Sequence, residues 1–192
     1  MDKFLIACLG NIGPEYSGTR HNAGFEVADA LSVKHKVSFE STRLVDKAEI
    51  KLKGKLLLVI KPTTFMNLSG KAIKYWLEKE KIEISRLLVV LDDIAIPLSK
   101  LRLKPSGSDG GHNGLTSIQE CLGTIEYPRL RFGIGGDFPK GRQVDFVLGK
   151  WDLGEKAVVK EKIQKSVEVI ETFALRGLET AMNDVNKMNF GA

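Results

Sequence analysis

The chain has 192 residues, of which 43% are hydrophobic and 28% are charged. This length and composition suit one domain with a buried core, and they exclude collagen-like, coiled-coil and disordered classes of protein. The 29 basic and 24 acidic residues give a net charge of +5, which permits a polyanionic partner without requiring one.

Three short apolar runs, rich in branched side chains, predict buried β-strands in the first half of the chain. They cover residues 4–9, 56–60 and 87–91. Apolar residues recur at helical spacing over 23–31 and 73–77, so a helix is predicted after each of the first two strands. The polar residues Asn22 and Ser69 stand before these helices and are predicted N-caps. This alternation of strands with helices indicates an α/β fold.

Two segments in the second half, 101–103 and 130–132, alternate strictly with charged neighbours. We predict that they are outer strands of a mixed sheet, each with one face in the core and one in water. The glycine-rich segment 106–114 leads into a further predicted helix. From Trp151 onward the apolar spacing predicts two C-terminal helices that are separated at Gly177.

We predict a single domain over residues 1–192, because no stretch has the Pro and Gly content of a linker. Cys8 and Cys121 have no partner at CxxC spacing, which favours a reducing compartment over a disulfide framework or a zinc cluster. The apolar run near the N-terminus is too short for a signal-peptide core, and no segment approaches the ~20 apolar residues of a membrane span. The chain is therefore predicted to be cytoplasmic, with no membrane partner.

Polar side chains follow the predicted strands. Asn11 comes after the first strand, Asn67 a few residues beyond the second, and Asp92 and Asp93 end the third. Ligands of open α/β sheets bind outside the carboxyl ends of the strands, so these side chains could meet in one crevice. With Asn113 of the glycine-rich segment, the asparagines offer amides that suit a peptide or ester carbonyl. The alternative is that Asn and Asp only form turns and caps after strands.

Two of the three histidines, His21 and His112, lie in loops rich in Asn and Gly, whereas His35 follows a predicted helix and is expected to be solvated. An imidazole has an ordinary pKa of about 6.5, which suits a general base near neutral pH. Asp92 could orient His21 by the logic of a Ser-His-Asp triad, with water as the nucleophile. A helix-capping His21 and an ordinary strand-ending Asp92 remain the alternative. No metal is predicted, because His21 and His112 are far apart in sequence and have no ligand spacing.

The two outer strands each carry a basic face. The cations that period-two alternation places on these faces are Lys100, Arg102, Lys104, Arg129 and Arg131. If the strands are neighbours, the five cations form one patch that would suit the phosphates of a nucleic acid. A solvated face with charges that serve solubility is an equally weighted alternative.

The whole chain closely resembles the bacterial peptidyl-tRNA hydrolases. The resemblance rests on five blocks in the family's order, at residues 10–25, 61–70, 101–115, 129–135 and 146–149. It implies a monomeric α/β fold with a mixed, twisted sheet flanked by helices. It also implies hydrolysis of the ester that joins a peptide to the 3′-terminal ribose of tRNA, which frees the tRNA for reuse in translation, without a cofactor.

By position, the resemblance implies that His21 is the catalytic base and that Asp92 is its partner. The residues that it places in the substrate cleft are Asn11, Tyr16, Met66, Asn67, His112 and Asn113. It implies tRNA phosphate contacts for Arg102, Lys104 and Arg131, and a movable rim made by the glycine-rich loop and the C-terminal helices. Two other functions stay open: an RNA-binding module without catalysis, and a hydrolase of small acyl esters or amides.

Overall fold

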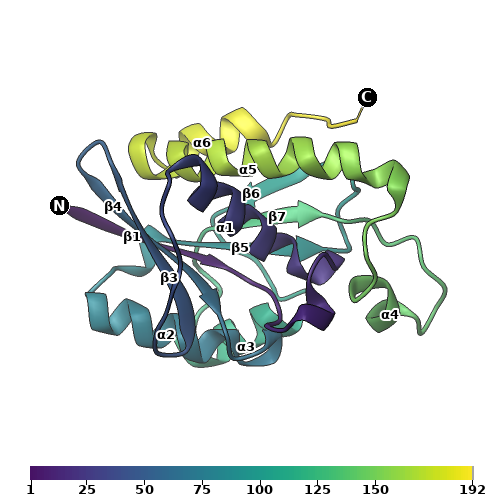
Figure 1. Cartoon of the computed structure of the whole chain (residues 1–192), viewed down its shortest axis with the longest axis horizontal. Helices are drawn as coiled ribbons and strands as arrows, with labels where there is room; N and C mark the ends of the chain where they lie inside the picture. The colour runs from purple at the N-terminus through teal and green to yellow at the C-terminus, as the bar shows by residue number, and fades with distance from the viewer. Residues whose placement is uncertain (192) are drawn as a thin grey trace.

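Seven strands form one mixed sheet in the computed structural model, which describes residues 1–191 (Figure 1). Their order across the sheet is β2-β3-β4-β1-β5-β7-β6. The strands are β1 (Asp2–Cys8), β2 (Glu40–Ser41), β3 (Val45–Leu52), β4 (Lys55–Pro62), β5 (Leu87–Asp93), β6 (Leu101–Lys104) and β7 (Arg129–Gly133). Strands β4, β1, β5 and β7 are parallel, and the outer strands pair antiparallel.

Helices cover both faces of this sheet. In Figure 1, α1 (Ala23–Lys34), α5 (Lys156–Arg176) and α6 (Leu178–Val185) lie above it, and α2 (Ser69–Glu80) and α3 (Asn113–Leu122) lie below it. The short α4 (Gln143–Val147) lies beyond the end of the sheet, on the opposite side of the molecule from the N-terminus. Successive residues of β1 enter different cores, with Ile6 packed under α1 and Leu5 over α2. The single α/β domain of the sequence analysis is therefore confirmed.

The apolar runs are buried strands, as predicted, because parallel strands covered on both faces need apolar residues at every position. The sequence analysis missed β2 and β3. In β3 Val45 is buried in the core on the α2 side and Ile50 in the core on the α1 side, while the charged residues of the strand are partly or fully exposed because β3 lies near the edge of the sheet. A related prediction was wrong for β7: it lies between β5 and β6, so four of its five residues are buried instead of half of them.

The helix starts differ from prediction in detail. Ser69 is the first residue of α2 instead of its N-cap, and its hydroxyl donates to the Met66 carbonyl. Asn22 does occupy the N-cap position of α1, but its side chain bonds Asn11 and not the helix. The two C-terminal helices are confirmed as α5 and α6, and they separate at Gly177, which has a φ of 94°.

Three other features of the chain bear on the predictions. His35 ends α1 and its Nε2 lies 2.9 Å from Glu171 Oε2 of α5, so it is paired and half-buried instead of solvated. Cys8 and Cys121 form no disulfide within the described residues. Among residues 1–191, no helix is both long and apolar enough to cross a membrane.

A lysine of α5, Lys162, is fully buried, with its Nζ donating to the Gly133 carbonyl and lying 4.1 Å from the centre of the Phe132 ring. Burial lowers the pKa of Lys162 to about 7. Between that value and its ordinary 10.5, the unfolded chain binds more protons than the folded one, so stability rises with pH in this window. The energetic penalty of the buried ammonium is fully present below pH 7.

We expect Lys162→Met to remove this pH dependence. Relative to the variant, the wild type should gain about 2 kcal/mol of unfolding free energy between about pH 7 and pH 9. Urea denaturation at several pH values measures the difference, and Lys160→Met, at an exposed position of the same helix, is the control. Parallel pH curves for wild type and Lys162→Met would show that Lys162 keeps its ordinary pKa.

Candidate active site

The carboxylate of Asp92 in β5 is the centre of a buried polar cluster. Its Oδ2 lies 2.8 Å from Nδ1 of His21, and its Oδ1 lies 2.9 Å from Nε2 of His112. The side chain of Asp92 is 2% exposed, and those of His21 and His112 are 11% and 12% exposed. The sequence analysis paired His21 with Asp92, and the fold adds His112 as a second partner of the same carboxylate.

The contacts of His112 define which nitrogens carry protons. His112 is the N-cap of α3, where its Nδ1 accepts a hydrogen bond from the Gly114 N–H at 3.0 Å. Its Nε2 must therefore carry the hydrogen that is donated to Asp92. Because an ionised carboxylate only accepts, His21 also donates to Asp92, through Nδ1. This leaves the lone pair of His21 Nε2 to accept a proton.

The charge of Asp92 is stabilised by this arrangement. Burial by itself would raise the pKa of the carboxyl, but the charges of His112 and His21 when protonated, and their hydrogen bonds, lower the pKa to about 2. Asp92 is therefore ionised at neutral pH. A buried carboxylate beside an imidazole stabilises the imidazolium that forms when the ring accepts a proton.

The turn that carries His21 is held close to the sheet. His21 lies in the 3₁₀ turn Arg20–Asn22, directly before α1. A Cβ on Gly24, in the first turn of α1, would lie 2.5 Å from the Leu9 carbonyl oxygen and 2.7 Å from that of Val90. Only glycine lets the start of α1 approach the ends of β1 and β5 so closely, and this approach brings His21 to Asp92.

The amide of Asn11, just after β1, is oriented by two neighbours. Asn11 Oδ1 accepts from the Met66 N–H at 2.7 Å. Asn22 bonds the Asn11 backbone on both sides, accepting from its N–H at 2.8 Å and donating to its carbonyl at 2.9 Å. Since its oxygen is used, Asn11 can present its Nδ2 donor to a ligand. The sequence analysis assigned Asn22 to helix capping and so missed this positioning role.

The other predicted cleft residues surround Asn11 and the start of α3. Asn67 is exposed and belongs to the 3₁₀ turn Met66–Leu68. Met66 is buried, and its Sδ lies 2.9 Å from the position that a Cβ on Gly114 would occupy. Asn113 is the exposed first residue of α3. The ring of Tyr16 meets that of Phe65 edge-on, with ring centres 6.3 Å apart.

A cavity of about 100 Å³ opens onto the His21, Asp92 and His112 cluster. Its wall is completed by Ile94, Ala95, Gly110, Asn113, Arg131, Gln143, Val144 and Val147, among others. Asn11 lines a separate cavity of about 240 Å³ beside it, with Asn22. The fold thus brings the predicted catalytic pair together with His112, Asn113 and Arg131, whereas Asn11 lines the other cavity and is bonded to Asn22, the residue after His21.

The same cluster has the donor types of a metal site. One possible ligand atom from each of His21, Asp92 and His112 lies within 4.8 Å of the others, so their separation in sequence does not keep them apart. Both imidazole nitrogens that face Asp92 are hydrogen-bonded to it, at 2.8 and 2.9 Å. A metal ion would have to replace both bonds, so the residues present fit a proton-transfer site better than a metal site.

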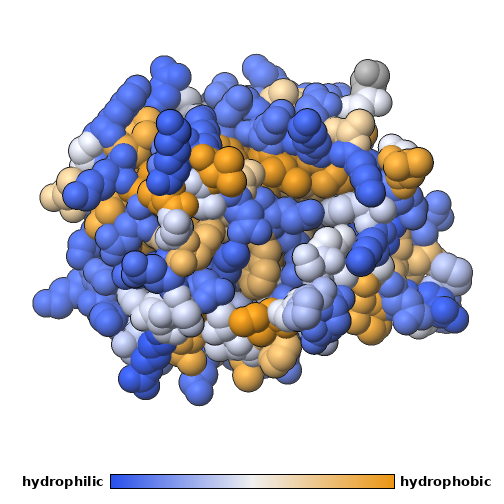
Figure 2. All heavy atoms as spheres, viewed as in Figure 1, coloured by the Kyte–Doolittle hydropathy of each residue, from blue (hydrophilic) through white to orange (hydrophobic). Residues whose placement is uncertain are grey.

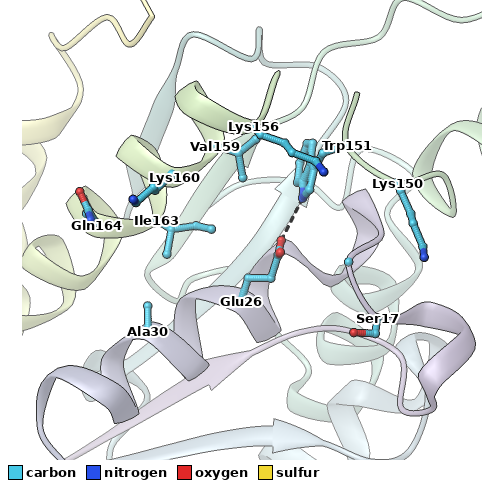
Figure 3. Close-up of a pocket in the computed structure, with 11 residues that line it drawn as sticks. Ser17, Glu26, Ala30, Lys150, Trp151, Lys156, Val159, Lys160, Ile163 and Gln164 are labelled. Atoms are coloured by element: carbon cyan, nitrogen blue, oxygen red, sulfur yellow. Dashed lines mark hydrogen bonds between the residues drawn. The ribbon is translucent and has the colours of Figure 1, made fainter. Parts of the chain in front are cut away.

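A larger cavity, of about 540 Å³, lies elsewhere, between α1 and α5 (Figure 3). Val159 and Ile163 of α5 point into it, and Glu26 Oε2 accepts from the Trp151 indole N–H at 3.0 Å. Burial raises the pKa of Glu26. Figure 2 shows apolar surface along the edge of α5, bordered by hydrophilic side chains. Among the described residues that line this cavity no acid is paired with a base, so the smaller cavity is the better candidate for chemistry.

The basic patch is smaller than predicted. Strands β6 and β7 are neighbours, as expected, with Arg102 opposite Arg131. Arg129 is 1% exposed, because its guanidinium donates to the carbonyls of Gly107 and Ile125, so it is not part of the patch. Arg131 donates to Asp93 at the edge of the active-site cavity. Arg102 and Lys104 are the exposed cations of β6.

Comparison with known proteins gives one consistent result. A family model described as peptidyl-tRNA hydrolase matches residues 5–191. The chain is 51% identical over 184 residues to the peptidyl-tRNA hydrolase of Parabacteroides distasonis, which covers 96% of this chain and 98% of that protein. It is 49% identical to that of Porphyromonas gingivalis, over 96% of this chain and all of that protein. A crystal structure of peptidyl-tRNA hydrolase from Acinetobacter baumannii has a TM-score of 0.92 and 30% identity, over 97% of this chain and 95% of that chain.

Proposed function

The chain belongs to the peptidyl-tRNA hydrolase family, whose enzymes act on an ester bond, and on this premise we propose that His21 is its general base. The observation that carries the proposal is the 2.8 Å hydrogen bond between His21 Nδ1 and the buried Asp92. This bond leaves His21 Nε2 unprotonated and directed away from the carboxylate. An imidazole in this state can take a proton from water at neutral pH.

The reaction follows from these roles. His21 Nε2 accepts a proton from a water molecule, whose oxygen attacks the carbonyl carbon of the ester. The carbonyl oxygen becomes an oxyanion, and the carbonyl re-forms as the bond to the 3′ oxygen of the ribose breaks. The His21 imidazolium, stabilised by Asp92, gives its proton to that leaving oxygen. The products are a peptide with a free carboxylate and a tRNA with a free 3′-hydroxyl.

Neutral amides around the base serve the peptide and the oxyanion. Asn11 is the first candidate for an oxyanion donor, because its oxygen is bonded to Met66 and its Nδ2 is left to donate. Asn67 and Asn113 are exposed, and their amides suit hydrogen bonds to the peptide backbone. Tyr16 and Met66 complete the substrate side of this site.

We propose further that the enzyme acts as a monomer in the cytoplasm. One chain supplies His21, Asp92 and His112, so the proton-transfer cluster is complete without a second subunit. The substrate is a product of translation, which places the reaction where translation occurs. Arg102, Lys104 and Arg131 are proposed to hold tRNA phosphates at the margin of the cavity.

The Lys104→Ala variant tests the phosphate contact. Because each contacted phosphate releases bound counterions, losing one contact should weaken tRNA binding and lower the slope of log K against log salt by about 1. Equilibrium binding of tRNA at several salt concentrations measures the slope. Lys74→Ala, an exposed lysine of α2, is the matched control and should leave the slope unchanged. Equal slopes for wild type and Lys104→Ala would exclude Lys104 from phosphate binding.

A hydrolysis assay separates the proposed function from its alternatives. The substrates are a short N-acylated aminoacyl-tRNA and the matching ester of a free nucleotide, each with and without EDTA. We expect faster turnover of the tRNA ester and no effect of EDTA. Equal turnover of both esters would favour a hydrolase of small esters, and tRNA binding without turnover would favour an RNA-binding module. Inhibition by EDTA would contradict the metal-free mechanism.

A further inference from the structure

We propose that Arg20 is a positioning residue that fastens α4 to the turn carrying His21, and so holds the far wall of the active-site cavity in place. The inference deepens the proposed function, because the wall that Arg20 holds faces His21. It rests on the contacts of Arg20, on the room that Gly149 gives it, and on the shortness of α4.

The guanidinium of Arg20 reaches from the His21 turn to α4 and to the turn that precedes α5. Its Nη1 donates to the Phe146 carbonyl at 3.1 Å, and its Nη2 donates to Glu155 Oε1 at 3.0 Å. The Arg20 backbone N–H donates to the Gly149 carbonyl at 2.9 Å. The residue before Arg20, Thr19, forms an isolated β-bridge with Lys150. Side chain and backbone therefore tie the same two segments together.

Arg20 is also packed between aromatic rings. Its Cζ lies 4.3 Å from the centre of the Phe146 ring and 5.8 Å from that of Trp151, at distances where a guanidinium is attracted to a ring face. Its Nε is buried and has no hydrogen-bond partner among the described residues. A buried arginine with an unpaired donor is costly. Its remaining contacts, with Phe146 of α4 and with Trp151, Asp152 and Glu155 before α5, are what offset this cost.

Gly149 provides the space for this contact. A Cβ on Gly149 would lie 2.7 Å from Arg20 Nη1 and 3.2 Å from the carbonyl oxygens of Asp145 and Phe146. Any larger residue would push the guanidinium away from the end of α4. Gly149 can therefore be used to displace Arg20 without removing its charge.

The helix α4 needs such a contact because it has only five residues. An isolated helix of this length is not stable, because the free-energy cost of nucleating it exceeds the stabilisation from its few hydrogen bonds. Arg20 bonds a carbonyl near its C-terminus, where a cation is also favoured by the helix dipole. Gln143, Val144 and Val147 of α4 line the cavity across from His21. Release of α4 would remove this wall, whereas the His21 to Asp92 bond does not depend on it.

Arg20 holds the cavity wall formed by α4 and not the base His21, so its loss should affect substrate binding more than the chemical step. In Arg20→Met the substrate loses contacts with α4, so the KM for peptidyl-tRNA should rise about tenfold while kcat changes less than threefold. The acidic limb of the kcat pH profile should stay in place, because Asp92 still holds His21. Arg20→Lys, which keeps the charge but not the forked geometry, should restore part of the affinity.

The test uses the full chain and two independent readouts. Hydrogen exchange of the amides of Phe146, Leu148 and Gly149 should be faster in Arg20→Met and in Gly149→Ala, whether or not the variants are active. Steady-state kinetics on peptidyl-tRNA should show the rise in KM in both. Arg142→Met is the matched control, because Arg142 forms an ion pair with Asp145 at 2.8 Å but both side chains are 66% exposed.

Each other outcome would overturn the proposal. Unchanged exchange in Arg20→Met and Gly149→Ala would show that α4 is held without Arg20. A fall in kcat with a shifted pH profile would show that Arg20 acts on His21 itself. A lower melting temperature with wild-type exchange and kinetics would mean a general stabilising role. If His21→Ala proves fully active, the proposed mechanism fails, but the exchange result still decides the role of Arg20.

Discussion

Replacing His21 with alanine should lower kcat for peptidyl-tRNA hydrolysis by about 10²- to 10⁴-fold. The reason is that the variant keeps the cavity and the amides but has no group that can take the proton from water. Binding of tRNA should be retained, since the exposed cations Arg102 and Lys104 of β6 are not part of the His21, Asp92 and His112 cluster. Single-turnover hydrolysis and equilibrium tRNA binding measure the two properties separately.

The chain contains its own control for this substitution. His35 is also hydrogen-bonded to a carboxylate, Glu171, at 2.9 Å, but it lies at the end of α1 and lines neither cavity beside the base. His35→Ala should hydrolyse peptidyl-tRNA at the wild-type rate. Near wild-type turnover by His21→Ala would remove His21 from the role of general base.

Asp92→Asn should have an effect of similar size, about 10³- to 10⁴-fold in kcat, because it changes which nitrogen of His21 carries the proton. Two imidazoles donate to the two oxygens of Asp92, whereas an amide has one oxygen. The tautomer of His112 is fixed by the Gly114 N–H, so His112 takes the amide oxygen. The amide NH₂ then faces His21 Nδ1, which must accept. His21 Nε2 becomes protonated and cannot act as a base.

This second prediction has both a spectroscopic and a kinetic measurement. The ¹⁵N chemical shifts of the His21 ring should report Nε2–H in Asp92→Asn and Nδ1–H in the wild type, and kcat should fall together with that change. Glu171→Gln, which alters the other histidine–carboxylate pair, is the matched control. Wild-type turnover with the altered tautomer would contradict the mechanism. The low pKa of Asp92, about 2, means that its own titration should not affect activity between about pH 5 and pH 9.

The sequence predicted the centre of the fold better than its margins, for a physical reason. A parallel strand covered on both faces must be apolar at every position, as 4–9 is, so composition alone reveals it. The strand β3 is half-polar and pairs with β2 and, across the turn at Lys53 and Gly54, with β4. Its identity as a strand depends on that pairing, which a local pattern does not contain.

The candidate site was predictable in part. Strand-end position and residue chemistry pointed to His21 and Asp92, and the hydrogen bond between them is present. The role of His112 as a second donor depends on the start of α3 lying against β5, which spacing along the chain does not give. Periodicity placed Arg129 on the basic face correctly. It could not reveal that the loop carbonyls of Gly107 and Ile125 accept hydrogen bonds from its guanidinium and bury it.

The close approach at Gly24 gives the two sides of the cavity different freedom to change. On the side of the proposed base His21, any side chain at residue 24 would collide with the backbone of two strands, so this position does not tolerate substitution. The opposite wall of the cavity is the short helix α4, whose cavity-lining side chain Val144 is largely exposed. If the proposed site is correct, substitution in residues 143–147 is expected to change the preferred peptide without disturbing the His21, Asp92 and His112 cluster.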